Sequence, residues 1–127
     1  MTLRRLSLIR PNMGDFRSTD AMMPLSLGVL AGRTPKGVDI RLFDDRVESL
    51  PLDDAPDLMA ITVETFTARR AYQIADGYRA RGIPVVMGGY HPTFLPEESL
   101  QHADAVVTGD AEGSWESLLE DFNWRPI

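Results

Sequence analysis

A short apolar run at residues 58–63, Leu-Met-Ala-Ile-Thr-Val, limits the possible folds more than any other part of the sequence. A run of this length without polar–apolar alternation is typical of a strand that is buried on both faces. Such strands occur in parallel sheets that helices cover on both sides. The flanking segments should therefore contain further strands and the covering helices.

Apolar spacing outside this run predicts those elements. Ala71, Ile74, Ala75 and Tyr78 repeat at helical spacing, and Gly82 follows as a stop. Alternation of strands and helices predicts an α/β domain, a flavodoxin-like or Rossmann-like three-layer sandwich whose five-stranded parallel sheet has the order 2-1-3-4-5. We expect strands at residues 3–10, 38–43, 58–63, 83–87 and 105–108, helices at 25–33, 68–81, from Pro96 and from Trp115, and at most a brief helical turn within 46–56.

Length and composition narrow the classes of function. The 127 residues predict one domain over residues 1–127. The chain has no cysteine, so disulfides, thiolate metal sites and an iron–sulfur cluster held by its own thiolates are excluded. A formal net charge of -6 argues against nucleic-acid binding. Because the sequence has neither a long apolar stretch nor a secretion signal, we expect no membrane association and a cytoplasmic location.

In sheets of this order, ligands bind outside the carboxyl ends of the strands, where the strand order reverses. The loops concerned are expected at residues 11–23, 62–67, 88–94 and 109–113. Gly88 and Gly89 either let the backbone approach a bulky ligand or form a tight turn. Thr67 is interpreted as a helix cap, and His91 as a polar loop residue rather than a metal ligand.

Three further residue groups are interpreted as structural. His102 is expected at the surface, and Asp44 with Asp45 at a solvated strand end. Trp115 and Trp124 are expected to pack in the core.

The loop after the first strand contains Gly14 but no lysine–serine pair and no three-glycine fingerprint, which excludes a P-loop and a dinucleotide site of that kind. The acidic residues and lysine of a receiver domain are absent from the strand ends, and no nucleophile elbow is present.

Three stretches together resemble the N-terminal cobalamin-binding domain of the cobalamin-dependent radical-SAM family. They are residues 57–65, Asp-Leu-Met-Ala-Ile-Thr-Val-Glu-Thr; 85–93, Val-Val-Met-Gly-Gly-Tyr-His-Pro-Thr; and 103–112, Ala-Asp-Ala-Val-Val-Thr-Gly-Asp-Ala-Glu. Residues 24–31 also look like the first helix of that family. The resemblance extends over essentially the whole chain, and the combination is more specific than any one stretch.

The resemblance implies a cofactor and a set of contacts. The cofactor would be cobalamin, with Ala60 and Gly28 beside its nucleotide tail and with Thr62, Thr65 and Thr93 as partners of the corrin amides. The implied cofactor-binding residues are Asn12, Met13, Gly14, Thr62, Glu64, Thr65, Gly88, Gly89, Tyr90, His91, Thr93, Gly109, Asp110 and Glu112. Cobalamin carriers with an Asp-x-His-x-x-Gly motif place a histidine on cobalt, but residues 12–17 read Asn-Met-Gly-Asp-Phe-Arg, which implies base-off cobalamin without that ligand.

The resemblance also implies a larger protein. In that family, a radical-SAM barrel with a Cys-x-x-x-Cys-x-x-Cys motif follows this domain, and the intact enzyme binds a 4Fe-4S cluster and S-adenosylmethionine. The cysteine-free chain would then be a fragment, without catalytic residues of its own, whose partner is a C-terminal barrel beyond residue 127. The intact protein would be a methyltransferase or related enzyme. Two alternatives stay open: the same fold without cofactor as a docking or substrate-recognition domain, and an unrelated flavodoxin-like module that binds, for example, flavin.

Overall fold

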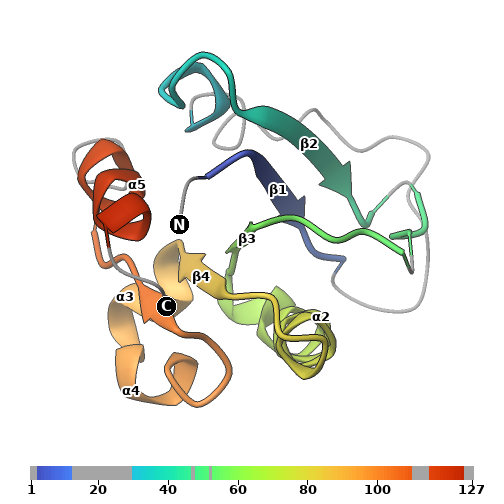
Figure 1. The fold of residues 1–127 in the computed structure, drawn as a ribbon. Coiled ribbons are helices and arrows are strands. Elements are labelled where there is room, and N and C mark those ends of the chain that lie inside the picture. The colour runs from blue at the N-terminus through green and yellow to red at the C-terminus, as the bar shows by residue number, and fades with distance from the viewer. Residues whose placement is uncertain (1–2, 13–29, 47, 52, 110–114, 125–127) are drawn as a thin grey trace.

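The computed structural model describes residues 3–12, 30–46, 48–51, 53–109 and 115–124, the last segment with side chains up to Asp121. Five strands form one all-parallel sheet in the order β2-β1-β3-β4-β5, which confirms the predicted order (Figure 1). The strands are β1 Arg5–Arg10, β2 Asp39–Asp44, β3 Leu58–Thr62, β4 Val85–Gly88 and β5 Ala105–Val106.

The central strands are apolar on both faces because helices cover both faces of the sheet. On one face, Met59 and Ile61 pack with the buried residues of α2 Ala68–Ala80. On the other face, Leu8, Ala60 and Val86 pack with Leu30 and with Trp115 of α5 Trp115–Trp124. Alternation along each strand therefore divides the core into two layers. The packing role predicted for Trp115 is confirmed, since this side chain is 2% exposed.

The predicted periodicity of α2 is confirmed. Ala71, Ile74, Ala75 and Tyr78 are all buried against the sheet, and the helix ends at Ala80, one residue earlier than expected. Gly82 follows with φ 81°, a backbone conformation that glycine adopts without strain. The predicted helix at 25–33 lies mostly outside the described residues, and residues 30–32 are helical.

Short helices follow β4. The segment 88–94, expected as a loop, contains α3 Tyr90–Phe94, and α4 Pro96–Ser99 comes next with Pro96 in its first turn. A helix of five residues is too short for hydrophobic periodicity to predict it. Residues 46–56 contain no helix in the part that the structure describes. None of the described helices is long and apolar enough to cross a bilayer.

Buried polar contacts hold the connection from β2 to β3 in place. Asp54 is 5% exposed. Its Oδ2 accepts hydrogen bonds from the hydroxyl of Ser7 at 2.8 Å and from that of Tyr78 at 2.7 Å. Asp57 accepts from the backbone N–H groups of Arg4 and Arg5 at 2.9 Å. Burial and the Asp54 carboxylate raise the pKa of the Tyr78 phenol far above its ordinary value. This cluster lies at the amino ends of the strands, away from the edge described next.

Candidate binding edge of the sheet

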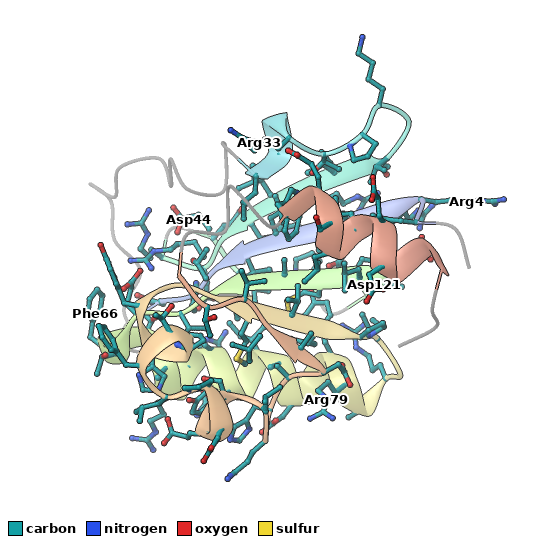
Figure 2. All side chains as sticks on the ribbon, turned by 90° about the vertical axis from the view of Figure 1, so that its left-hand side faces the viewer. Arg4, Arg33, Asp44, Phe66, Arg79 and Asp121 are labelled. Carbon is teal, nitrogen blue, oxygen red and sulfur yellow. The ribbon has the colours of Figure 1, made fainter. Side chains whose placement is uncertain are left out.

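The carboxyl ends of the strands form one edge of the sheet, and the strand order reverses there between β1 and β3. Figure 2 shows Asp44 and Phe66 at this edge, toward which the strand arrows point, and Arg4 at the opposite end. The described parts of the loops that the sequence singled out therefore start at this one edge. We call this place the carboxyl edge.

The start of the loop after β1 is held by a buried carboxylate. Asn12 is 7% exposed, and its backbone N–H donates to Oδ2 of Asp45 at 2.9 Å. Arg70 of α2 donates to the same carboxylate through Nε at 2.8 Å and Nη2 at 3.2 Å. Asp45 is fully buried, so the interpretation of Asp45 as a solvated strand end is wrong. The carboxylate avoids the cost of desolvation because it is paired and hydrogen-bonded.

The carboxylate of Asp44 pairs with Arg46, whereas that of Asp45 pairs with Arg70. Its carboxylate accepts from Nε of Arg46 at 2.9 Å and from Nη2 at 2.8 Å. Burial opposes ionisation of Asp44, but the hydrogen bonds and charge of Arg46 outweigh it and hold the pKa below its ordinary value. Asp44 and Arg46 thus neutralise each other at the end of β2.

The loop after β3 turns into a 3-10 helix, η1 Thr65–Thr67. Thr67 is buried, and its hydroxyl accepts from the backbone N–H of Glu64 at 2.9 Å and donates to its carbonyl at 3.2 Å. Thr67 stands at the N-cap of α2, as expected, but its side chain makes no cap hydrogen bond to that helix. The predicted cap therefore secures the 3-10 turn instead.

Gly89 permits a close approach of two backbones. It has φ 112°, and a Cβ built there would lie 2.6 Å from the carbonyl oxygen of Val63. The N–H of His91 donates to that same oxygen at 3.1 Å, and the N–H of Val63 donates to the carbonyl of Gly88 at 2.8 Å. In the structure, the backbone of the loop after β3 is therefore the group that approaches Gly89 closely. A Cβ at Gly88 would make only ordinary contact, with Val107.

His91 is buried and anchored, so its interpretation as a polar loop residue is wrong. It is 6% exposed, and its Nε2 lies 2.7 Å from Oε2 of Glu98 and 2.9 Å from the hydroxyl of Tyr72. Tyr72 in turn donates to the same oxygen of Glu98 at 2.7 Å. These hydrogen bonds from Tyr72 and then His91 lower the pKa of Glu98. The three side chains join α2, α3 and α4.

His102 adds a second contact to Tyr72. Its ring stacks on that of Tyr72 with centroids 4.1 Å apart, and its Nδ1 lies 2.9 Å from Oδ1 of Asp76. The side chain is 27% exposed, so the predicted surface position is correct only in part.

Thr93 connects the loops that follow β4 and β5. Its hydroxyl donates to the carbonyl of Gly89 at 2.7 Å and accepts from the N–H of Gly109 at 3.0 Å. Gly109 has φ 73°, and a Cβ there would meet nothing within 4 Å. Thr93 therefore has an internal role that its sequence position did not indicate.

Thr62 presents an unsatisfied polar atom at the carboxyl edge. Its Oγ1 is buried and has no hydrogen-bond partner among the residues that the structure describes. A buried hydroxyl without a partner is unfavourable and uncommon in folded proteins. It indicates a place where a ligand group with hydrogen-bonding capacity would be stabilised.

The remaining predicted contacts fall into three groups. Thr65, Tyr90 and Gly109 are exposed at the edge, and Glu64 is partly exposed. Ala60, placed beside the nucleotide tail, is 5% exposed within the core. Met13, Gly14, Gly28, Asp110 and Glu112 lie outside the described residues, as does the side chain of Trp124.

Sequence reasoning did not single out several contributors to this edge, among them three charged residues. Arg10 ends β1, Arg70 lies on α2, and Glu98 lies on α4. Only the position of Arg10, directly before the Pro11 loop, offered a signal in the sequence. The other two reach the edge through the packing of α2 and α4.

Comparison with known proteins identifies the kind of domain. The model of the B12 binding domain matches residues 27–119, which is most of the chain. The chain belongs to the B12-binding domain family. The matched region contains β2 to β5 and α2 to α4, and so includes most of the carboxyl edge. The recognition made from residues 57–65, 85–93 and 103–112 is thereby confirmed, and the flavodoxin-like fold agrees with it.

Curated relatives of this family member are methyltransferases by name. Bacteriochlorophyllide d C-8(2)-methyltransferase of Chlorobaculum tepidum is 41% identical over 110 residues, 86% of this chain and 24% of the relative. Bacteriochlorophyllide d C-12(1)-methyltransferase of the same organism is 39% identical over 101 residues, 78% of this chain and 22% of the relative. An uncharacterized methyltransferase of Pyrococcus horikoshii is 32% identical over 110 residues, which cover 76% of this chain and 24% of the relative. The chain thus spans about a quarter of the length of these relatives.

Proposed function

We propose that this chain is the cobalamin-binding module of a radical-SAM methyltransferase and that it binds the corrinoid base-off, without a histidine from an Asp-x-His-x-x-Gly motif as lower ligand. The match of the B12-binding family over residues 27–119 carries the proposal. The module binds and orients the cofactor, and cobalamin when bound supplies methyl-transfer chemistry.

The residues of the carboxyl edge suit a large ligand with many amide side chains. Thr65, Tyr90 and the backbone of Gly109 are exposed there and offer hydrogen-bonding groups. The unsatisfied hydroxyl of Thr62 offers another at the end of β3. Gly109 leaves open space where any side chain would project. These four residues are among the proposed cofactor contacts within the described part of the chain.

The histidines support a site without an imidazole ligand to cobalt. His91, the one histidine of the loop sequences, is held by Glu98 and Tyr72 through Nε2, and its Nδ1 lies 3.5 Å from the hydroxyl of Thr65. His102 is bound to Asp76 and stacked on Tyr72. Both ring nitrogens of His91 and Nδ1 of His102 therefore already lie beside other side chains. Residues 12–17 contain no histidine.

The whole-protein activity is part of the same proposal. The relatives named as methyltransferases are about four times as long as the stretch they share with this chain. We propose that a C-terminal radical-SAM barrel of the same polypeptide carries the Cys-x-x-x-Cys-x-x-Cys motif, the 4Fe-4S cluster and S-adenosylmethionine. The cysteine-free chain described here would present cobalamin to that barrel, in the cytoplasm.

Titration with cobalamin tests the proposal directly. The purified chain, and any longer polypeptide that contains it, is mixed with hydroxocobalamin or cob(II)alamin and passed over gel filtration, and the visible spectrum of the protein peak is recorded. We expect co-eluting cobalamin with a base-off spectrum. Absence of co-elution from both proteins would contradict cobalamin binding, and a base-on or histidine-bound spectrum would contradict the proposed mode. Binding by the longer protein alone would show that the barrel completes the site.

A further inference from the structure

Arg10 is a partly buried cation without a bonded partner. It is the last residue of β1, at the carboxyl edge beside the reversal of strand order. Its guanidinium forms no hydrogen bond or ion pair with any residue that the structure describes. The other described arginines are either exposed, namely Arg4, Arg5, Arg41 and Arg69, or bonded to an oxygen, namely Arg33, Arg46, Arg70, Arg79 and Arg81.

The surroundings of Arg10 leave its charge incompletely compensated. Desolvation, followed by repulsion from Arg46, lowers the pKa of its guanidinium, while Glu64 and Asp44 act in the opposite direction. Asp44 is already bonded to Arg46 through both oxygens. Phe66, which is 59% exposed, lies under the guanidinium with its ring centroid 6.0 Å from Cζ. A cation that has lost water without gaining an acceptor favours the binding of an anion.

Thr62 lies on the same face of the sheet, one strand away. β1 and β3 pair in parallel with Ile9 opposite Ile61, so the next position of each strand places Arg10 beside Thr62. Leu8 and Ala60, two residues earlier in each strand, pack in the same core layer. The unbonded guanidinium and the unsatisfied hydroxyl of Thr62 therefore belong to one short row at the edge, above the small side chain of Ala60.

We propose that Arg10 and Thr62 bind the phosphodiester of the cobalamin nucleotide tail. This inference rests on the proposed function and adds the group that the two residues recognise. The peripheral side chains of the corrin are neutral amides, whereas the phosphodiester that joins the nucleotide to the corrin carries a negative charge. Arginine binds phosphate oxygens with paired, charge-assisted hydrogen bonds, and a threonine hydroxyl donates one more. The row thus matches the one anionic group of the tail.

A comparison of cobalamin with cobinamide tests the assignment, because cobinamide has the corrin but lacks the phosphodiester and nucleotide. Dissociation constants of both are measured for the chain, in the longer polypeptide if that is needed for binding, and for Arg10→Met. We expect Arg10→Met to weaken cobalamin binding about 10-fold or more, the loss typical of a charge-assisted hydrogen bond, and to change cobinamide binding less than about 3-fold. Arg10→Lys should recover part of the loss.

Control variants separate this role from a structural one. Arg41→Met removes an exposed arginine from β2 and should change neither affinity. Thr62→Val keeps the shape of the side chain and should weaken cobalamin binding selectively, by a smaller factor than Arg10→Met. Circular dichroism of each variant checks the fold.

Four outcomes would overturn the assignment. Equal losses of both ligands in Arg10→Met would assign Arg10 to the corrin or to the fold, and no loss of either would remove it from the site. The site would be a general anion site if millimolar inorganic phosphate displaced cobalamin completely and if the protein bound cobalamin no more tightly than cobinamide. If the unaltered protein binds neither corrinoid, the proposed function itself fails, and the assignment fails with it.

Discussion

Gly89 shows how one residue fixes the geometry of the carboxyl edge. Its φ of 112° lies where residues with a side chain are strained, and the carbonyl of Val63 occupies the place of a Cβ. The loops after β3 and β4 can therefore bond directly to each other, through the N–H of His91 and the carbonyl of Val63. Glycine at this position lets the backbones of the loops after β3 and β4 lie in contact.

Substitution of Gly89 by alanine should destabilise the chain by about 2–3 kcal/mol, because backbone strain and the contact with Val63 add. Gly77→Ala is the matched control. Gly77 lies exposed within α2 with nothing near a built Cβ, so alanine there should stabilise the helix by roughly 0.5–1 kcal/mol. Urea denaturation of both variants measures the free energies of unfolding. Equal stability of Gly89→Ala and the unaltered chain would contradict the close approach.

At the scale of elements, three side chains connect helices that hydrophobic packing alone does not fix. α3 and α4 have five and four residues, too few for a stable hydrophobic face of their own. Tyr72 of α2, His91 of α3 and Glu98 of α4 meet within hydrogen-bonding distance. A half-exposed carboxylate thus takes part in the contacts that connect the segment after β4 to α2.

The stability that Glu98 provides should depend on pH. Its pKa is lowered in the folded chain from 4.5, so the folded state binds fewer protons than the unfolded state when the pH lies between the two values. The contribution is therefore complete above about 4.5 and is lost as the pH falls through the lowered pKa. We expect Glu98→Gln to have a lower urea midpoint than the unaltered chain at pH 6, and this difference to shrink toward pH 3.

Glu97→Gln is the control for this experiment, because it removes the same charge from the adjacent, exposed residue and leaves the contacts to Tyr72 and His91 in place. Its urea midpoint should follow that of the unaltered chain at each pH. A Glu98→Gln deficit that stays constant from pH 6 to pH 3 would show that the carboxylate charge is not what holds α4.

At the scale of the whole molecule, every described strand brings a loop to the same edge. Asp45 and Arg70 secure the loop of β1 to β2 and α2, Val63 and Gly89 join the loops of β3 and β4, and Thr93 with Gly109 adds the loop of β5. A ligand at this edge would contact loops that are already bonded to one another. Its binding energy should therefore stabilise the whole sheet.

Cobalamin at about 100 times its dissociation constant should stabilise the folded chain by about 2.7 kcal/mol and raise Tm by roughly 5–15 °C. Thermal unfolding followed by circular dichroism measures the shift. Flavin mononucleotide serves as the comparison ligand because flavodoxin-like modules also bind flavin. A shift produced by the flavin and not by cobalamin would replace the proposed cofactor.

The alternation of strands and helices in the sequence predicted the strand order, which the structure confirms. The spacing of apolar residues by itself determined the two-sided burial of β3 and the buried face of α2, because local geometry converts that spacing into faces of strands and helices. The resemblance in residues 57–65, 85–93 and 103–112 also identified the B12-binding family correctly. The short α3 was missed because five residues show no period.

Only the tertiary structure decided which polar residues at the edge are engaged and which are open. Asp45 was expected in solvent and His91 as a loop residue, yet both are buried. Asp45 is bonded to Arg70, 25 residues away in sequence, and His91 to Glu98, 7 residues away. The side chains of Arg10 and Thr62 have no hydrogen-bond partner among the described residues, and the register of β1 and β3 places these two residues side by side. Whether a polar group is paired depends on contacts between distant segments, and these exist only once the sheet has assembled.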